Sequence, residues 1–415
     1  MKKIISIFIL CYIGIGYGQS TIKTMFYNVL NYPTAPPDTR EKVLETIIDS
    51  YEPDIFMICE LETEAGGEEI LNESLNDGHS DYSSAPFLFN FSNSDIELHQ
   101  LLYFNNKKFT LIQSQRLINA IRDINWYTLE LITDEQNTDP IRIEIFVAHL
   151  KASQGADNEQ KRLDMVEVFV DNQINLDQDA YVLFAGDFNL YSSNEPAYQA
   201  ILNSGNRIVM VDPINTDGDW HTNSTFEGIH TQSTRISSSG FDNFGSGGGL
   251  DDRFDFIMMS ENMRSDTKLS YIPNTYASYG NNGNCYNQRI DDSNCTGIYD
   301  AALRSALYNM SDHLPVVMEL QTNQEFLSTP DFNQITKLVQ LNSGTIVDDI
   351  LSLTINNSLG SVNFKIYNTL GQEVQSFTSK NQSILNVSVE SLSGGVYYII
   401  PTNIKHSTIK FVKRG

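Results

Sequence analysis

Six short polar motifs, each closing an apolar run, follow one another along this chain. They read FYNVLNY (26–32), DIFMICELE (54–62), FVAHLKAS (146–153), VLFAGDFNLY (182–191), DDRFDFIMMS (251–260) and MSDHLPVVMEL (310–320). The apolar runs predict buried strands, and the motifs put Asn, Glu, His or Asp where the strands end. Because α/β folds hold their chemistry at strand ends and in the loops just beyond, we expect these side chains to meet. One motif alone, such as AGDFN, is equally compatible with a functional site and with an ordinary strand followed by a turn.

The oxygen-bearing side chains of these motifs indicate a site for a hard divalent cation. Glu60 and Asn28 offer ligands from neighbouring strand ends, and Asp312 completes a set that suits Mg²⁺ or Mn²⁺ better than Zn²⁺. The sequence also leaves open whether an additional Ca²⁺ ion binds. Asp187 is placed to orient or deprotonate a water, with Asn189 two residues on and facing the same way. Such a set can hydrolyse a phosphodiester, which needs an attacking water and relief of charge on the phosphoryl oxygens.

The motifs resemble those of the endonuclease/exonuclease/phosphatase superfamily, which includes pancreatic-type deoxyribonucleases, abasic-site endonucleases, sphingomyelinases and inositol-phosphate phosphatases. GDFN and SDH are its most specific signatures, and RFDFI is similar to its R-x-D-[YF]-I strand. The stretch GGGLDDRFDFIMMS looks most like secreted bacterial nucleases. The resemblance covers roughly residues 21–321. It implies an α/β fold, a four-layer sandwich of two mixed β-sheets flanked by helices.

The resemblance also implies roles for the two histidines of the motifs. His313 would contact the phosphate, and Asp255 would fix its tautomer. His149, in HLK, resembles the second histidine of the deoxyribonuclease and sphingomyelinase branches. Abasic-site endonucleases typically carry Tyr there, which argues against a repair role. A Glu usually supports this histidine in the deoxyribonuclease branch, and Glu97 is the candidate here.

Some of these residues also allow plainer interpretations. Asp255 could pair with its neighbour Arg253, and Asn28 could be an ordinary strand-end residue. Lys151 is equally compatible with a phosphate contact and with a solvated side chain. We assign no role to three residues of the long loop: Trp220, His221 and His230.

Helix signals separate the motifs. Asp38 and Thr39 are placed to cap a helix, and a second helix is predicted over about 158–172. Asn194 and Pro196 resemble an N-cap and first-turn proline of a third helix. The segment 214–250 is rich in Gly, Ser, Thr and Asn, which predicts a long loop.

The N-terminus and the cysteines indicate export. Residues 1–18 combine two lysines, a short apolar run and small residues, as in a secretory signal peptide, and the run is too short for an ordinary spanning helix. Cys285 and Cys295 flank a polar loop and should form a disulfide in an oxidising compartment. A metal site there is a poor alternative, because C-x-x-C spacing is absent. Cys59, inside FMIC, is predicted to be a buried free thiol.

The net charge of -25 is unevenly spread. The signal peptide carries +2 and residues 337–415 carry +3, which leaves about -30 on residues 19–336. This charge argues against tight non-specific binding of nucleic acid, which needs a basic surface. It does not argue against a nuclease, because divalent cations offset the repulsion locally.

The sequence changes character after about residue 322. Residues 322–339 resemble a linker, and 340–415 contain short alternating strands that predict a small all-β sandwich. KIYNTLGQEV, SLSGGVYYI and the terminal KFVK resemble, in this order, the C-terminal sorting domain of the type IX secretion system. This resemblance implies that the type IX secretion machinery is a partner and that the protein is released or attached to the cell surface.

The chain is therefore expected to be a secreted, divalent-metal-dependent phosphodiesterase with residues 19–321 as its catalytic domain. We expect an extracellular nuclease that acts as a monomer on DNA, with RNA as a further substrate, and without stable membrane insertion. A phosphomonoesterase or a sphingomyelinase-like phospholipase on the same scaffold is the alternative. A non-catalytic surface protein is a third possibility, but it would not need to retain the whole set of polar residues.

Overall fold

The computed structural model describes residues 20–91, 98–119, 121–327, 339–342, 345–355, 361–380, 384–402 and 409–414. The chain divides into two compact units, residues 1–327 and 328–415. The predicted signal peptide, Glu97 and residues 328–338 of the predicted linker lie outside the described residues. The first six residues of that linker belong to the first unit, where Gln324 is buried and accepts a hydrogen bond from Thr133.

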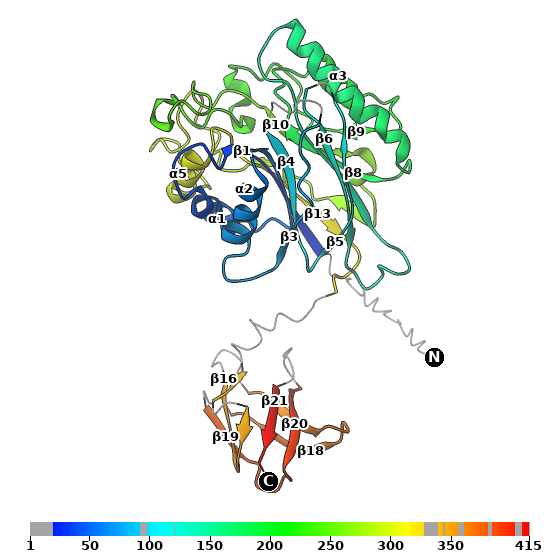
Figure 1. Cartoon of the computed structure of the whole chain (residues 1–415), viewed down its shortest axis with the longest axis vertical. Coiled ribbons are helices and arrows are strands. Elements are labelled where there is room, and N and C mark those ends of the chain that lie inside the picture. The colour runs from blue at the N-terminus through cyan, green and yellow to red at the C-terminus, as the bar shows by residue number, and fades with distance from the viewer. Residues whose placement is uncertain are drawn as a thin grey trace, which may run out of the picture. The chain divides into compact units, whose positions relative to one another are not determined.

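Two mixed sheets form the centre of the first unit (Figure 1). The first sheet has the strand order β11-β13-β1-β2-β4-β3, with β12 paired to β13. Its strands are β1 (Ser20–Tyr32), β2 (Ile55–Leu61), β3 (Tyr82–Ser84), β4 (His99–Asn105), β11 (Leu269–Tyr271), β12 (Ala277–Ser278) and β13 (Val316–Thr322). The second sheet has the order β5-β6-β7-β8-β10-β9. Its strands are β5 (Phe109–Leu117), β6 (Ile124–Leu131), β7 (Arg142–His149), β8 (Tyr181–Asp187), β9 (Met210–Val211) and β10 (Asp255–Ser260).

The two sheets face each other, and helices cover their outer faces. β1 and β2 lie against β8 and β7. Helices pack in pairs beside each sheet (Figure 1): α1 (Arg40–Tyr51) with α5 (Ala301–Met310), and α3 (Ala156–Asn172) with α4 (Pro196–Ile201). The short α2 (Glu64–Glu69) follows β2. This is the predicted four-layer sandwich. Among the described residues, no helix is long and apolar enough to cross a membrane.

Strands that are covered on both faces explain the unbroken apolar runs of the sequence. In β2 the residues IFMIC are all buried, as are VLFAG in β8. In a sheet with neither face exposed to solvent, apolar and polar residues need not alternate along the strands. The parallel pairs, β1 with β2 and β7 with β8, are central in their sheets, so the carboxyl ends of these strands share one edge.

The predicted helices are present, but their N-caps differ from the prediction. Thr39 precedes α1 with a left-handed backbone (φ 66°) and makes no side-chain cap hydrogen bond. Pro196 begins α4 as expected, whereas the N-cap is Glu195 and not Asn194. The Glu195 carboxylate accepts a hydrogen bond from the buried Arg162 of α3 at 2.8 Å. The ion pair between the two helices therefore explains why an acidic residue occupies this position.

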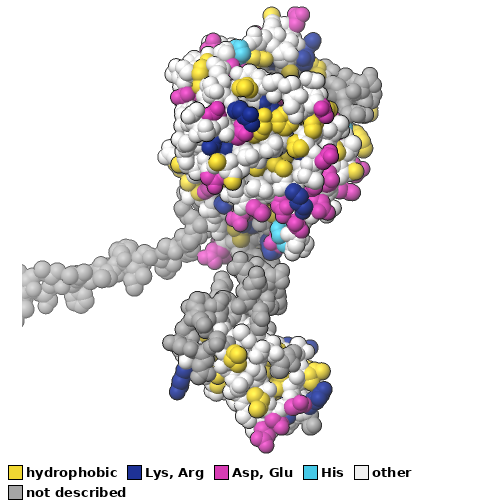
Figure 2. Space-filling view, turned by 90° about the vertical axis from the view of Figure 1, so that its left-hand side faces the viewer, with side chains coloured by type: hydrophobic (Ala, Val, Ile, Leu, Met, Phe, Trp, Pro, Cys, Tyr) yellow, Lys and Arg dark blue, Asp and Glu magenta, His cyan; other side chains and the backbone are white. Residues whose placement is uncertain are grey.

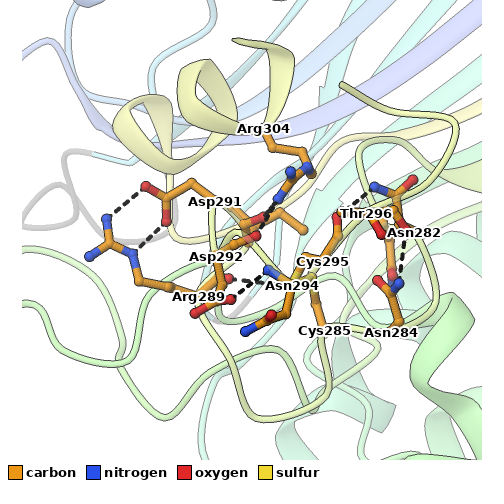
Figure 3. The surroundings of a disulfide bond; sticks show 12 residues. Asn282, Asn284, Cys285, Arg289, Asp291, Asp292, Asn294, Cys295, Thr296 and Arg304 are labelled. Atoms are coloured by element: carbon orange, nitrogen blue, oxygen red, sulfur yellow. Dashed lines mark hydrogen bonds and ion pairs between the residues drawn. A yellow bond between two sulfur atoms is a disulfide. The ribbon is translucent and has the colours of Figure 1, made fainter. Parts of the chain in front are cut away.

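The predicted disulfide joins Cys285 to Cys295 in the loop between β12 and α5 (Figure 3). The two Cα atoms are 5.2 Å apart, and both side chains are buried. Arg304 of α5 donates to the carbonyl oxygen of Asp292 at 2.8 Å, which anchors the loop to the helix. Cys59 is a buried free thiol, as predicted.

The described part of the second unit consists of strands. One sheet has the order β14-β16-β19, with β14 (Val339–Leu341), β16 (Ile350–Ile355) and β19 (Ile384–Ser388). The other has the order β15-β21-β20-β17-β18, with β15 (Ile346–Val347), β21 (Ile409–Lys413), β20 (Gly395–Pro401), β17 (Asn363–Asn368) and β18 (Glu373–Thr378). Apolar side chains of both sheets, among them Leu353 and Phe364, form one buried cluster. This confirms the predicted all-β region.

Replacing both Cys285 and Cys295 with Ala should lower the free energy of unfolding by about 2–3 kcal/mol, because the unfolded chain is no longer restricted by the closed loop. Urea denaturation measures this change. Reductant should destabilise the wild-type protein by the same amount and leave the double variant unaffected. Equal unfolding midpoints for the wild-type and variant proteins would contradict the role of the bridge.

Candidate active site

Three of the predicted site residues form a row across the second sheet. β7, β8 and β10 are neighbours, and the strand register pairs Asp187 with His149 on one side and with Asp255 on the other. All three side chains are buried. The polar ends of three separate motifs thus meet because of strand pairing, as the sequence predicted for this edge.

The first sheet and the segment before β13 complete the cluster. Asn28 in β1 donates from Nδ2 to Glu60 Oε1 in β2 at 2.9 Å and to Asp187 Oδ2 at 3.1 Å. This amide therefore links the two sheets. A pocket of about 280 Å³ opens above the cluster, and its lining includes Glu60, His149, Asp187, Asn189, Asp312 and His313.

His313 is held by Asp255 in the way that the resemblance implied. The distance from its Nδ1 to Asp255 Oδ2 is 2.7 Å, and its Nε2 lies 3.7 Å from Asp187 Oδ2. Arg253 does not compete for Asp255, because its guanidinium binds Asp212 at 2.8 and 3.0 Å. Burial alone would lower the pKa of His313, but the charges of the surrounding aspartates together raise it well above the usual value. The surrounding carboxylates thus favour the protonated form of His313.

The surroundings of His149 shift its pKa in the opposite direction. Its Nε2 lies 3.5 Å from Asp187 Oδ2 and 3.9 Å from Glu60 Oε1. Burial, assisted by the positive charge of Arg122, lowers its pKa well below the usual value. Its Nδ1 is buried and has no hydrogen-bond partner among the described residues. The site thus shifts the pKa values of its two histidines in opposite directions. Such a difference allows two chemically identical side chains to perform different tasks.

The carboxylates of the site are crowded with like charge. Burial raises the pKa of Asp187 to about 7, with further upward contributions from Asp255 and Glu60, whereas His313 lowers it. The pKa of Glu60 is also raised, first by burial and then by Asp312. A carboxyl group with a pKa near neutrality can accept a proton from water and release it again.

The donor set fits a divalent cation. Glu60, His149 and Asp187 offer ligand atoms within 4.8 Å of one another, and Asp187, Asp255 and His313 form a second such group. Asp312 belongs to neither group. Its Oδ2 accepts from Ser246 N at 2.7 Å, whereas its Oδ1 is buried without a hydrogen-bond partner among the described residues. An unpaired anionic oxygen beside other carboxylates is an environment that a bound cation would stabilise.

Two predicted residues lie in the site in an unexpected orientation. The side-chain oxygen of Asn28 accepts from Leu30 N at 3.0 Å, so the amide presents its nitrogen, and not its oxygen, to the carboxylates. Asn189 follows the end of β8 in the left-handed region (φ 51°), so strand alternation does not govern its direction. It nevertheless lines the pocket, and its backbone N–H donates to Asp187 Oδ1 at 3.1 Å.

The structure adds Gln232 and Arg122, which the sequence analysis did not select. Gln232 comes from the long loop, and its Nε2 lies 3.0 Å from Asp312 Oδ2 and 2.6 Å from His313 Nε2. Arg122 precedes β6 and donates to the carbonyl oxygens of His149 and Leu150 at 3.3 and 3.0 Å. Neither residue lies in a recognisable motif, so only the tertiary fold reveals them.

The remaining candidates lie outside the cluster. Lys151 donates from Nζ to the carbonyl oxygen of Ala152 at 2.8 Å and does not line the pocket. His230 is buried, and its Nε2 lies 2.9 Å from the Trp220 carbonyl oxygen. His221 Nδ1 lies 2.6 Å from an oxygen of Asp252. These contacts fix the long loop against the sheet edge.

Substituting Asp255→Asn should lower the pKa of His313, because the charge of the carboxylate bound to its Nδ1 is removed. NMR titration of the histidine ring carbons measures this change. Asp139→Asn is the matched control: it removes a partly exposed carboxylate that pairs with Lys268, and it should leave the titration of His313 unaltered. An unchanged His313 titration in Asp255→Asn would exclude Asp255 as the group that holds the imidazolium.

Residues 347–414 match a family model described as the secretion system C-terminal sorting domain. This confirms the resemblance found in the C-terminal strands and identifies a secreted or cell-surface protein. No curated protein matches the chain by sequence.

The solved structures that resemble the chain are distant. An endonuclease/exonuclease/phosphatase family protein from Bacteroides thetaiotaomicron has 14% identity and a TM-score of 0.48, covering 74% of this chain and 99% of that one. TDP2 from D. rerio, complexed with single strand DNA product, has 15% identity and a TM-score of 0.46, covering 73% and 100%. The human Nocturnin catalytic domain has 16% identity and a TM-score of 0.42, covering 73% and 97%. At these values the activity has to be argued from the site itself. The chain is thus a secreted or cell-surface protein that carries a secretion system C-terminal sorting domain.

Proposed function

We propose that residues 19–321 form a secreted, Mg²⁺- or Mn²⁺-dependent phosphodiesterase that hydrolyses nucleic acid. The observation that carries this proposal is the row of His149, Asp187 and Asp255 in strand register, with His313 bound to Asp255. It puts a carboxylate with a pKa of about 7 between a charged imidazole and a neutral one. Water activation and stabilisation of a phosphate both need groups of these kinds.

Each side chain then has a distinct task. Asp187 accepts a proton from the attacking water, and Asn189 holds that water beside it. The imidazolium of His313 donates from Nε2 to a phosphoryl oxygen, because Asp255 keeps the other ring nitrogen engaged. The neutral His149 donates to a second oxygen of the same phosphate. Charge that develops on the phosphoryl group is therefore met by donors on side chains that the fold holds in place.

Glu60 and Asp312 would hold the cation. A bound Mg²⁺ or Mn²⁺ would neutralise charge on the phosphoryl and leaving oxygens. The unpaired Asp312 Oδ1 and the raised pKa of Glu60 support this assignment, because a bound cation would give that oxygen a partner and would lower that pKa. No residue is assigned to an additional Ca²⁺.

The acidic surface is compatible with a nucleic acid substrate that is turned over and not tightly held. Figure 2, which views the side of the first unit where α1 and α5 lie, shows acidic side chains spread over this face and no continuous basic surface. Counterion release by a basic surface is the usual source of tight non-specific binding. This chain would instead bind a phosphate through cations held in its site. Both DNA and RNA are candidate substrates.

The purified full chain should cleave DNA in Mg²⁺ or Mn²⁺ and lose this activity in EDTA. Asp187→Asn should reduce kcat by at least ~100-fold, the usual scale for loss of an acid or base group, with little change in stability. His79→Ala, in an exposed turn, is the control and should retain wild-type rates. Undiminished cleavage in chelator, or near-native turnover by Asp187→Asn, would refute the mechanism.

The same preparations distinguish the alternative functions. A small phosphomonoester and sphingomyelin vesicles are assayed beside DNA under identical conditions. Faster hydrolysis of the monoester or of the lipid would replace the nuclease assignment, and inactivity on every substrate would favour a non-catalytic surface protein.

Residues from 340 onward are proposed to act in export alone. Their removal should leave kcat within about twofold, because all proposed ligands and catalytic groups precede residue 314. In a host with type IX secretion, the truncated enzyme should remain inside the cell. Mass spectrometry of wild-type enzyme in the medium should find a chain that ends between about 322 and 345. A released chain that still ends at Gly415 would indicate a binding module instead.

A further inference from the structure

Three phenylalanines with alternate spacing lie just before β4. Phe89 and Phe91 expose 59% and 67% of their surface, and Phe87 is half-buried beside them. We call Phe87, Phe89 and Phe91 the aromatic ledge. Single exposed apolar residues are common, but a contiguous group of large rings marks a surface that contacts something else.

The ledge is held in place by its neighbours. The Phe87 and Phe89 ring centroids are 4.9 Å apart at 80°, and His99 packs against both, at 4.9 and 5.7 Å. The guanidinium of Arg116 lies over the Phe91 ring at 5.4 Å and donates to the Phe89 carbonyl oxygen at 2.6 Å. The exposed rings are therefore positioned before any partner arrives, and they carry a cation with them.

The ledge lies at the same edge of the sandwich as the catalytic cluster. On the first sheet, His99 pairs with Leu61, the residue that follows Glu60. On the side of the second sheet, Phe91 N donates to Asp123 Oδ2 at 2.6 Å, and Asp123 directly follows Arg122.

Arg122 continues this connection to the site. Its guanidinium donates to the carbonyl oxygen of His149, and its charge acts on Glu60 and Asp187. The backbone of the ledge is thus joined to the strand end that carries His149 through Asp123 and Arg122.

We propose that the aromatic ledge stacks the bases of unpaired nucleotides, which makes single-stranded nucleic acid the preferred substrate. This inference rests on the proposed phosphodiesterase function and specifies its substrate class. Bases in a duplex present their faces to one another, whereas unpaired bases can stack on exposed rings. Arg116 complements a phosphate of such a strand, and stacking needs no basic surface. A phosphocholine headgroup can also contact rings and a guanidinium, so binding to lipid vesicles is measured beside binding to the single strand.

The test separates binding from chemistry. A fluorescent single strand of about 12 nucleotides, within the range of known single-strand sites, and a hairpin duplex are titrated in EDTA with the full chain. The wild-type protein should bind the single strand more tightly. The double variant Phe89→Leu/Phe91→Leu, which keeps apolar side chains without rings, should raise the Kd for the single strand at least ~10-fold. Phe89→Trp/Phe91→Trp should restore wild-type affinity.

Activity on a base-free diester distinguishes this inference from the proposed function. Hydrolysis of bis(p-nitrophenyl) phosphate in Mg²⁺ should be equal in wild-type protein, in the Leu variant and in Ile174→Ala, a control that removes an equally exposed apolar residue. Absence of that hydrolysis in the wild-type protein refutes the proposed function. If the diester is hydrolysed but the Leu variant binds the single strand within twofold of wild type, the ledge is not a base-stacking site. If the Leu variant loses binding to sphingomyelin vesicles but keeps its affinity for the single strand, the ledge is a lipid contact and the proposal is overturned.

Discussion

The burial of four carboxylates at one edge of the sandwich is the constraint to which the rest of the site responds. Glu60, Asp187, Asp255 and Asp312 come from different elements, and their mutual repulsion in a desolvated place raises the pKa values of Glu60 and Asp187. Two groups offset this repulsion. The Asn28 amide donates hydrogen bonds to Glu60 and Asp187, and the carboxylates raise the pKa of His313, which favours a positive charge there. Charges of this kind persist in a fold only where something offsets their desolvation, here partly protein and, by our proposal, partly a cation.

The fold holds these groups together against that repulsion. Arg40, buried in α1, donates to the carbonyl oxygens of Leu30 at 2.9 Å and of Met310 at 3.1 Å, so it fastens the end of β1 to the end of α5. Glu60 adopts φ 61°, in a region that L residues seldom occupy. Backbone strain of this sort is kept where the surrounding structure over-determines it, and it is typical of functional sites. The buried strands of both sheets provide that surrounding structure.

The sequence predicted the parts of the site that local patterns encode. Apolar runs ending in polar residues located Glu60, His149 and Asp187 correctly at strand ends, because strands covered on both faces leave few polar positions. Gln232 could not be found in this way, since its place beside His313 depends on a loop packed against a strand that follows much later in the chain. The orientation of the Asn28 amide could not be predicted from the sequence either, because it depends on the positions of Glu60 and Asp187 in the folded chain.

Electrostatics and stacking have complementary effects in this chain. An acidic catalytic unit repels a polyanion at long range, so affinity has to come from contacts that act at short range and are insensitive to net charge. A cation between Glu60 and Asp312 would act on one phosphate, and exposed rings at the same edge would act on bases that carry no charge. Neither holds a long nucleic acid firmly, and product can therefore leave. The surface charge that disfavours tight binding is thus compatible with the turnover that the proposed activity needs.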